Sequence, residues 1–143
     1  MLSMSLVRGW LAGVLPLSFV LLAGSAHADE VEYTVVAKPV TLKVGQNTPL
    51  AVQFAPKAPW HWNKDYPAKL MLVAEGVTIA RTELKQQQDD FKITKAGIET
   101  AFSLTAVKPG KTTGTLKGKI GLCDDKVCII KKVELTVAMT ATL

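Results

Sequence analysis

Apolar and polar residues alternate along most of this chain, and this period of two constrains its fold more than any other feature. The clearest run is C-terminal, where the apolar positions are Val133, Leu135, Val137, Met139 and Ala141. Side chains on a β-strand point to opposite faces in turn, so alternation predicts strands that bury one face. Further strands are predicted at residues 31–35, 40–44, 50–54, 70–73, 102–106 and 113–122.

Turn-forming residues separate these segments, as in Gly45-Gln46-Asn47 and Lys108-Pro109-Gly110. Residues 29–143 carry no helical stripe, and the polar run at residues 81–90 is predicted to be a loop or a short helical turn. About seven to eight strands at this spacing predict an all-β fold, an immunoglobulin-like antiparallel β-sandwich.

The N-terminal segment has the pattern of an export signal. Arg8 precedes an apolar run at residues 9–24, and Ala26-His27-Ala28 offers small residues at the two positions that a signal peptidase reads. We expect cleavage after residue 28, which leaves one periplasmic domain, residues 29–143. The apolar run is shorter than the roughly 20 residues of a spanning helix, so no stable membrane insertion is expected after cleavage.

The charge pattern argues against a nucleic-acid partner. The chain has 17 basic and 12 acidic residues, a formal net charge of +5. The lysines are spread along the sequence, many of them on the polar phase of predicted strands, which is typical of solvated faces and protected sheet edges. Nucleic-acid binding proteins instead concentrate their basic residues in one patch or stripe.

Cys123 and Cys128 are the only cysteines of the chain. Cys123 ends one predicted strand and Cys128 opens the next, so residues 124–127 are predicted to form a four-residue hairpin loop. Opposed residues of antiparallel strands have Cα atoms about 4.5 to 5.5 Å apart, a separation at which a disulfide can form. Both cysteines fall on the polar phase of their strands, which predicts accessible sulfurs.

The pair is either a structural staple or a redox-active dithiol. Closing a loop of about six residues contributes only about 2 kcal/mol, and an exposed bond exchanges readily, so we predict Cys123 and Cys128 to be the catalytic residues of thiol–disulfide exchange. Cys128 is the better nucleophile because Asp124 and Asp125 adjoin Cys123, whereas Lys126 lies near Cys128. The alternative is a non-catalytic exported binding or scaffold module, because structural hairpin disulfides are common in such proteins.

Two segments carry a resemblance to a known family. Residues 121–128, followed by an alternating strand, resemble the N-terminal periplasmic domain of the thiol:disulfide interchange protein DsbD. Residues 58–67, which contain Trp60-His61-Trp62, are similar to another segment of that family, and the likeness extends from about Val40 to Met139.

The resemblance implies an immunoglobulin-like sandwich that accepts electrons from a thioredoxin-like domain and passes them to periplasmic disulfide proteins. It also implies that Cys128 forms the mixed disulfide and that Cys123 resolves it. This sequence contains neither the transmembrane nor the thioredoxin-like domain of that family. We therefore expect a separate thioredoxin-like protein or membrane reductase as electron donor, and exported disulfide proteins as further partners.

No metal or cofactor is predicted. Outside the signal segment His61 is the one histidine, and with two cysteines it completes neither a zinc site nor a blue-copper site. We expect His61 to be a surface or half-buried residue with a local hydrogen bond; the alternative is a role in shielding or tuning the cysteine pair. Trp60 and Trp62 are expected to pack in the core and at its rim.

Overall fold

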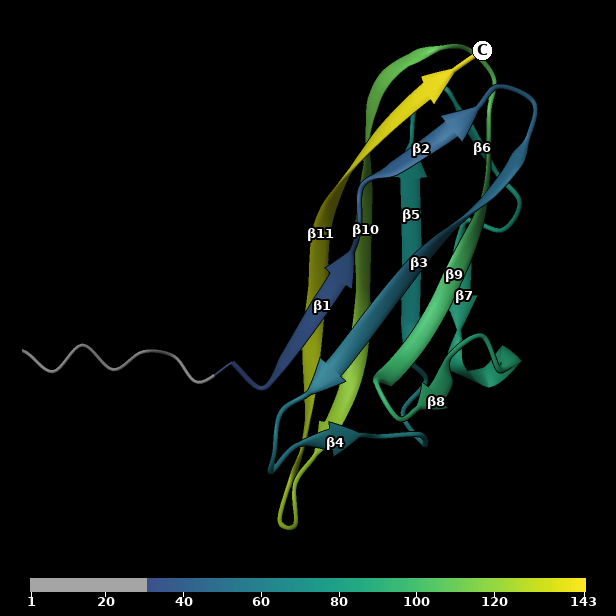
Figure 1. Ribbon diagram of the computed structural model, residues 1–143. Coiled ribbons are helices and arrows are strands. Elements are labelled where there is room, and N and C mark those ends of the chain that lie inside the picture. Colours follow the sequence, from purple (N-terminus) through teal and green to yellow (C-terminus); the bar gives the residue numbers. More distant parts are fainter. Residues whose placement is uncertain (1–30) are drawn as a thin grey trace, which may run out of the picture.

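The computed structural model describes residues 31–143, which form two β-sheets packed face to face (Figure 1). The strands are β1 (Tyr33–Ala37), β2 (Val40–Lys43), β3 (Asn47–Pro56), β4 (His61–Trp62), β5 (Lys69–Ala74), β6 (Val77–Ile79), β7 (Glu83–Lys85), β8 (Lys92–Thr94), β9 (Gly97–Ala106), β10 (Gly110–Cys123) and β11 (Cys128–Thr142). The predicted signal segment, residues 1–28, lies outside the described residues. Within the described part, no helix has the length and apolar character needed to cross a membrane.

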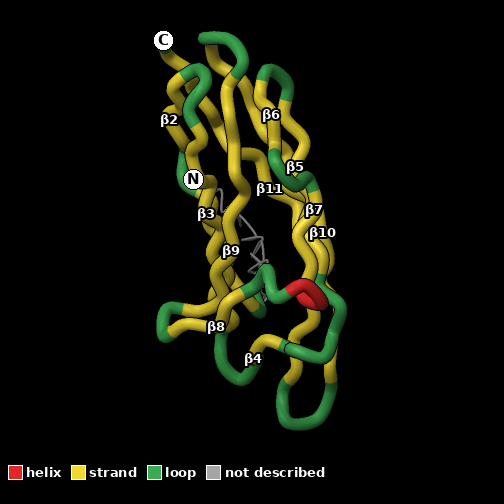
Figure 2. Tube along the Cα trace, turned by 90° about the vertical axis from the view of Figure 1, so that its right-hand side faces the viewer, coloured by secondary structure: helices red, strands yellow, loops and turns green. Residues whose placement is uncertain are grey.

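The two sheets have the connectivity of an immunoglobulin-like sandwich. One has the order β1-β3-β9-β6 with β8 beside β9, and the other the order β2-β11-β10-β5-β7 with β4 beside β10. Neighbouring strands are antiparallel except β2 and β11, which are parallel. Figure 2 shows the layers from the side, with β3 and β9 in one and β7 and β10 in the other. The predicted fold class is confirmed.

The structure has more strands than the seven or eight predicted. The additional strands are β4, β6, β7 and β8, each of only two or three residues. Such segments are too short to display alternation, and they form by pairing with β5, β9 and β10. Within the polar run at residues 81–90 lies a 3-10 turn, Gln86–Gln88, which agrees with the expected short helical turn.

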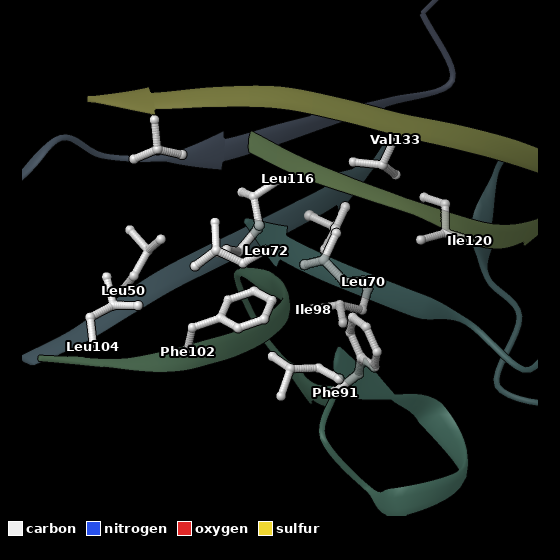
Figure 3. Close-up of a cluster of buried hydrophobic side chains, with 14 of the residues drawn as sticks. Leu50, Leu70, Leu72, Phe91, Ile98, Phe102, Leu104, Leu116, Ile120 and Val133 are labelled. Carbon is white, nitrogen blue, oxygen red and sulfur yellow. The ribbon is translucent and has the colours of Figure 1, made fainter. Parts of the chain in front are cut away.

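The core lies between the sheets and consists of the apolar phases predicted from the sequence. Figure 3 shows part of it, including Leu50, Leu70, Leu72, Phe102, Leu104, Leu116 and Ile120, each at most 2% exposed. Both layers contribute, and β11 adds Val133, Val137 and Met139. This continuous apolar cluster does not include the cysteines, so the sandwich has a core independent of any disulfide.

An aromatic cluster closes one end of the core. The Trp62 ring lies 5.5 Å from the ring centroids of both Phe54 and Phe91, and Trp62 Nε1 donates a hydrogen bond to Gln86 Oε1 at 2.9 Å. Trp62 is buried, and Trp60 is partly buried against the same core, as expected. Because the Trp62 side chain is anchored in this cluster, the short strand β4 is fixed beside β10.

Candidate functional site

The cysteines end the longest hairpin of the structure. Strands β10 and β11 pair over fourteen positions, from Gly110 opposite Ala141 to Cys123 opposite Cys128. Residues 124–127 form the loop, as predicted, and Figure 1 shows this loop projecting beyond the sandwich at the end opposite the C-terminus. The site therefore lies at the tip of a long, regular hairpin.

A disulfide joins the two cysteines. Its S–S distance is 2.03 Å, and the Cα atoms of Cys123 and Cys128 are 4.0 Å apart. This Cα separation is below the predicted range. The next pair along the hairpin, Asp124 and Val127, is hydrogen-bonded through the Asp124 N–H and the Val127 carbonyl at 2.9 Å. Hydrogen-bonded and non-bonded pairs alternate along antiparallel strands, so the cysteines occupy the closer, non-bonded kind of position.

Both cysteines lie on the outer face of their sheet. Leu122 is fully buried, so its neighbour Cys123 points outward, where it is partly exposed; Cys128 is exposed. Ile130 shares the outer phase with Cys128 and is 60% exposed, and the pairing of the two strands runs without a bulge. The predicted polar phase of both cysteines is confirmed, and Cys128 is the more accessible of the two.

The hairpin loop is shaped by its own hydrogen bonds. Asp124 Oδ1 accepts the backbone N–H groups of Val127 at 2.7 Å and Lys126 at 2.8 Å. These two bonds lower the pKa of the Asp124 carboxyl, and the nearby His61 lowers it further by its charge. Asp124 thus stabilises the hairpin loop predicted for residues 124–127, and the loop conformation has support besides the disulfide.

His61 lies beside the disulfide. Strand β4 pairs with β10 so that His61 is opposite Cys123 and Trp62 is opposite Leu122. Since Trp62 and Leu122 point into the core, His61 and Cys123 share the outer face. His61 is exposed. Within residues 31–143 its side chain makes no hydrogen bond, in contrast to the local hydrogen bond expected from the sequence. Alternation along the sequence did not predict β4, because a two-residue strand is too short to show it; a role beside the cysteine pair was considered for His61 only as the alternative.

Metal ligands do not gather in the described part of the chain. Residues 31–143 contain no group of three or more His, Cys, Asp or Glu side chains that could hold a metal ion.

No protein-family model matches the sequence, and no curated protein matches it. Solved structures with similar folds include domains 4 and 5 of the S-layer protein SbsC, at 15% identity and a TM-score of 0.47, over 77% of this chain and 51% of that chain. This chain thus spans about half of the SbsC fragment. AggA, the major subunit of Escherichia coli aggregative adherence fimbriae type I, is 14% identical, with a TM-score of 0.39 over 77% of this chain and 94% of that chain.

A cohesin module of a Clostridium perfringens family 33 glycoside hydrolase is 10% identical, with a TM-score of 0.39 over 77% of this chain and 98% of that chain. None of these structures is DsbD, so that resemblance stays a prediction. The fold and the site define an immunoglobulin-like β-sandwich module with a disulfide across the mouth of its longest hairpin.

Removing the disulfide is expected to leave the sandwich folded. The double variant C123S/C128S should lose about 2 kcal/mol of unfolding free energy, because the bond closes a loop of only about six residues. Urea denaturation followed by far-ultraviolet circular dichroism measures this loss, with the reduced wild-type protein as a control. A loss above about 4 kcal/mol would show that the bond is a structural staple.

Proposed function

We propose that this chain is an exported thiol–disulfide exchange module that carries electrons through the Cys123–Cys128 pair. The exposed position of Cys128 at the tip of the hairpin is the observation that carries the proposal. A partner thiolate can approach that sulfur from solvent, while the core and the hairpin pairing stay intact during exchange. Accessible disulfides that contribute little to stability are the kind that exchange.

The exchange takes place in two balanced steps. A thiolate of a reduced partner attacks Cys128 Sγ, a partner–Cys128 bond forms, and the electron pair of the broken S–S bond leaves on Cys123 Sγ as a thiolate. The second thiol of the partner, as its thiolate, then attacks the mixed disulfide, releasing the Cys128 thiolate and an oxidised partner. The same steps in reverse pass two electrons from this chain to an oxidised acceptor.

His61 supports this direction of attack. A thiol of lower pKa leaves faster, and a nearby imidazolium favours the thiolate form of a cysteine. His61 lies opposite Cys123, the sulfur that leaves in the first step. On this basis His61 stabilises the Cys123 thiolate, which is the tuning role considered for this residue from the sequence.

The partners follow from the chemistry and from the resemblance to DsbD. The donor is a thioredoxin-like protein or a membrane reductase that supplies a dithiol, and the acceptors are exported proteins with disulfides. The export signal at residues 1–28 would bring the chain to the periplasm, a compartment in which disulfides persist.

The reduction potential of the pair tests the proposal. We expect a potential above about −300 mV, in the range of bonds that exchange in cells. The protein is equilibrated with mixtures of reduced and oxidised dithiothreitol, and its free thiols are counted by mass after alkylation. A potential below about −300 mV would mark a structural bond and contradict the exchange function.

A second candidate function is a non-catalytic exported binding or scaffold module in which the disulfide is an inert clip. One observation favours it. The outer face of the sheet that contains β10 exposes apolar side chains, with Val73 at 66%, Ile130 at 60% and Met71 at 43%. Exposed apolar residues on one face indicate a protein-binding surface, with or without redox activity. The potential measurement separates the two candidates.

A further inference from the structure

Four lysines stand in line across four neighbouring strands. The strand registers place Lys85 opposite Lys69, Lys69 opposite Lys119, and Lys119 opposite Lys132, on β7, β5, β10 and β11 respectively. Adjacent strands are about 4.8 Å apart, so this lysine row is about 14 Å long. Like charges directly opposite each other destabilise a sheet, so the row is not explained by stability.

Only one end of the lysine row is neutralised. Glu83 contacts Lys85 at 2.8 Å and Lys69 at 3.4 Å. Among the described residues, Lys119 and Lys132 take part in no ion pair, and both are exposed. The half of the row on β10 and β11 therefore carries unmatched positive charge.

The lysine row borders a groove on the outer face of β5, β10 and β11. The groove has a volume of about 510 Å³, and its lining includes Lys69, Lys119 and Lys132 together with the aromatic Tyr66 and the apolar Met71. The one carboxylate of the lining, Glu134, pairs with Lys117 at 4.0 Å, so the charge of the groove stays positive. It thus combines positive charge with apolar surface in one concave site. Protein segments with both acidic and apolar side chains match this combination.

The groove is continuous with the disulfide. Lys119 precedes Cys123 by four residues on the same face of β10, a distance of about 13 Å at the rise of a strand. Between them is Gly121, where an added Cβ would lie 2.6 Å from Tyr66 Cβ, and opposite Gly121 is the exposed Ile130. The Tyr66 side chain and Ile130 therefore connect the lysine row with the cysteine pair.

We propose that the lysine row and its groove dock an acidic, extended segment of the exchange partner. Carboxylates of that segment bind Lys119 and Lys132, and an apolar side chain contacts Tyr66, so that the cysteine of the partner reaches Cys128. The identity of the partner rests on the proposed function, but the binding needs no bond exchange. A peptide is favoured over a membrane surface because the site is concave and partly apolar.

A labelled peptide in which glutamate alternates with tyrosine tests the docking by fluorescence anisotropy. We expect it to bind both the wild-type protein and C123S/C128S, with an affinity that falls as sodium chloride is raised. The variant K119E/K132E should lose about tenfold or more in affinity, because it sets like charges against the peptide. The matched control K38E/K92E makes the same charge change at exposed lysines outside the groove, and its affinity should change by less than about twofold.

Three results would overturn the proposal: equal binding of the peptide with lysine in place of glutamate, unchanged affinity in K119E/K132E, or binding to phosphatidylglycerol vesicles but not to the peptide. The salt dependence is measured on the wild-type protein, so it needs no variant. A peptide affinity that does not fall as sodium chloride is raised would contradict the docking even if K119E/K132E does not fold. Peptide binding together with a reduction potential below about −300 mV would leave the docking site standing and contradict only the exchange function.

Discussion

Replacing Trp62 by alanine is expected to cost about 3 to 5 kcal/mol of unfolding free energy. The side chain is 7% exposed, its ring lies 5.5 Å from both Phe54 and Phe91, and its Nε1 donates to Gln86. Alanine would leave a large cavity at this end of the core and would remove the hydrogen bond that Trp62 Nε1 donates to Gln86 Oε1. Urea denaturation followed by circular dichroism measures the loss.

Two matched variants separate the contributions at this position. Trp62→Phe keeps an aromatic ring but loses the hydrogen bond to Gln86, so it should cost clearly less than Trp62→Ala. Trp60→Ala removes a half-buried indole from the same segment and should also cost less, because more of that side chain is already in water. Equal losses in Trp60→Ala and Trp62→Ala would contradict the anchoring role of Trp62.

The Trp62→Ala substitution is also expected to affect the cysteine site. Strand β4 contacts β10 through only two register pairs, and Trp62 is its buried residue. Without that side chain, only the backbone pairing of β4 with β10 and the hydrogen bond from the Asn63 N–H to the Gly121 carbonyl, at 2.9 Å, keep His61 opposite Cys123. Amide hydrogen exchange in β4 should therefore rise in Trp62→Ala before exchange in β10 or β11 does.

The sequence predicts the long strands and the hairpin because those elements carry their own pattern. Alternation over residues 133–141 identifies the buried phase of β11, and the four residues between the cysteines give the loop. The outer phase of Cys123 and Cys128 follows from the same parity. The alternation of apolar and polar residues was sufficient in each case, because the long strands of this sandwich keep one face in the core.

The parts that escaped prediction depend on contacts between distant segments. Nothing in the residues around His61 indicates a strand, and His61 comes to lie opposite Cys123 through the pairing of β4 with β10 and the packing of Trp62 against Phe54. The lysine row likewise arises from the strand registers. Its four lysines are far apart in the sequence, so their sequence positions do not indicate a basic patch. The parallel pairing of β2 with β11 also joins the two ends of the domain. Registers of this kind are set by the packing of the whole domain.

Trapping of partners is expected to differ sharply between the two cysteines. In Cys123→Ser, the exposed Cys128 can attack a partner disulfide, and no second thiol resolves the product, so covalent adducts should accumulate. In Cys128→Ser, the remaining Cys123 is less exposed than Cys128 and a partner disulfide reaches it less easily, so we expect about tenfold fewer adducts. The measurement is a non-reducing gel of each variant, alkylated in its native host and identified by mass.

The asymmetry, rather than the adducts themselves, tests the mechanism. Any exposed thiol forms some mixed disulfides, so adducts in Cys123→Ser alone would fit a chance reaction. A chance reaction, however, would trap many unrelated proteins, whereas docking at the lysine row selects a few acidic ones. Combining Cys123→Ser with K119E/K132E should therefore reduce the specific adducts and spare the nonspecific ones. Equal adduct patterns in Cys123→Ser and Cys128→Ser would contradict attack at Cys128, because Cys128 is exposed and Cys123 is only partly exposed.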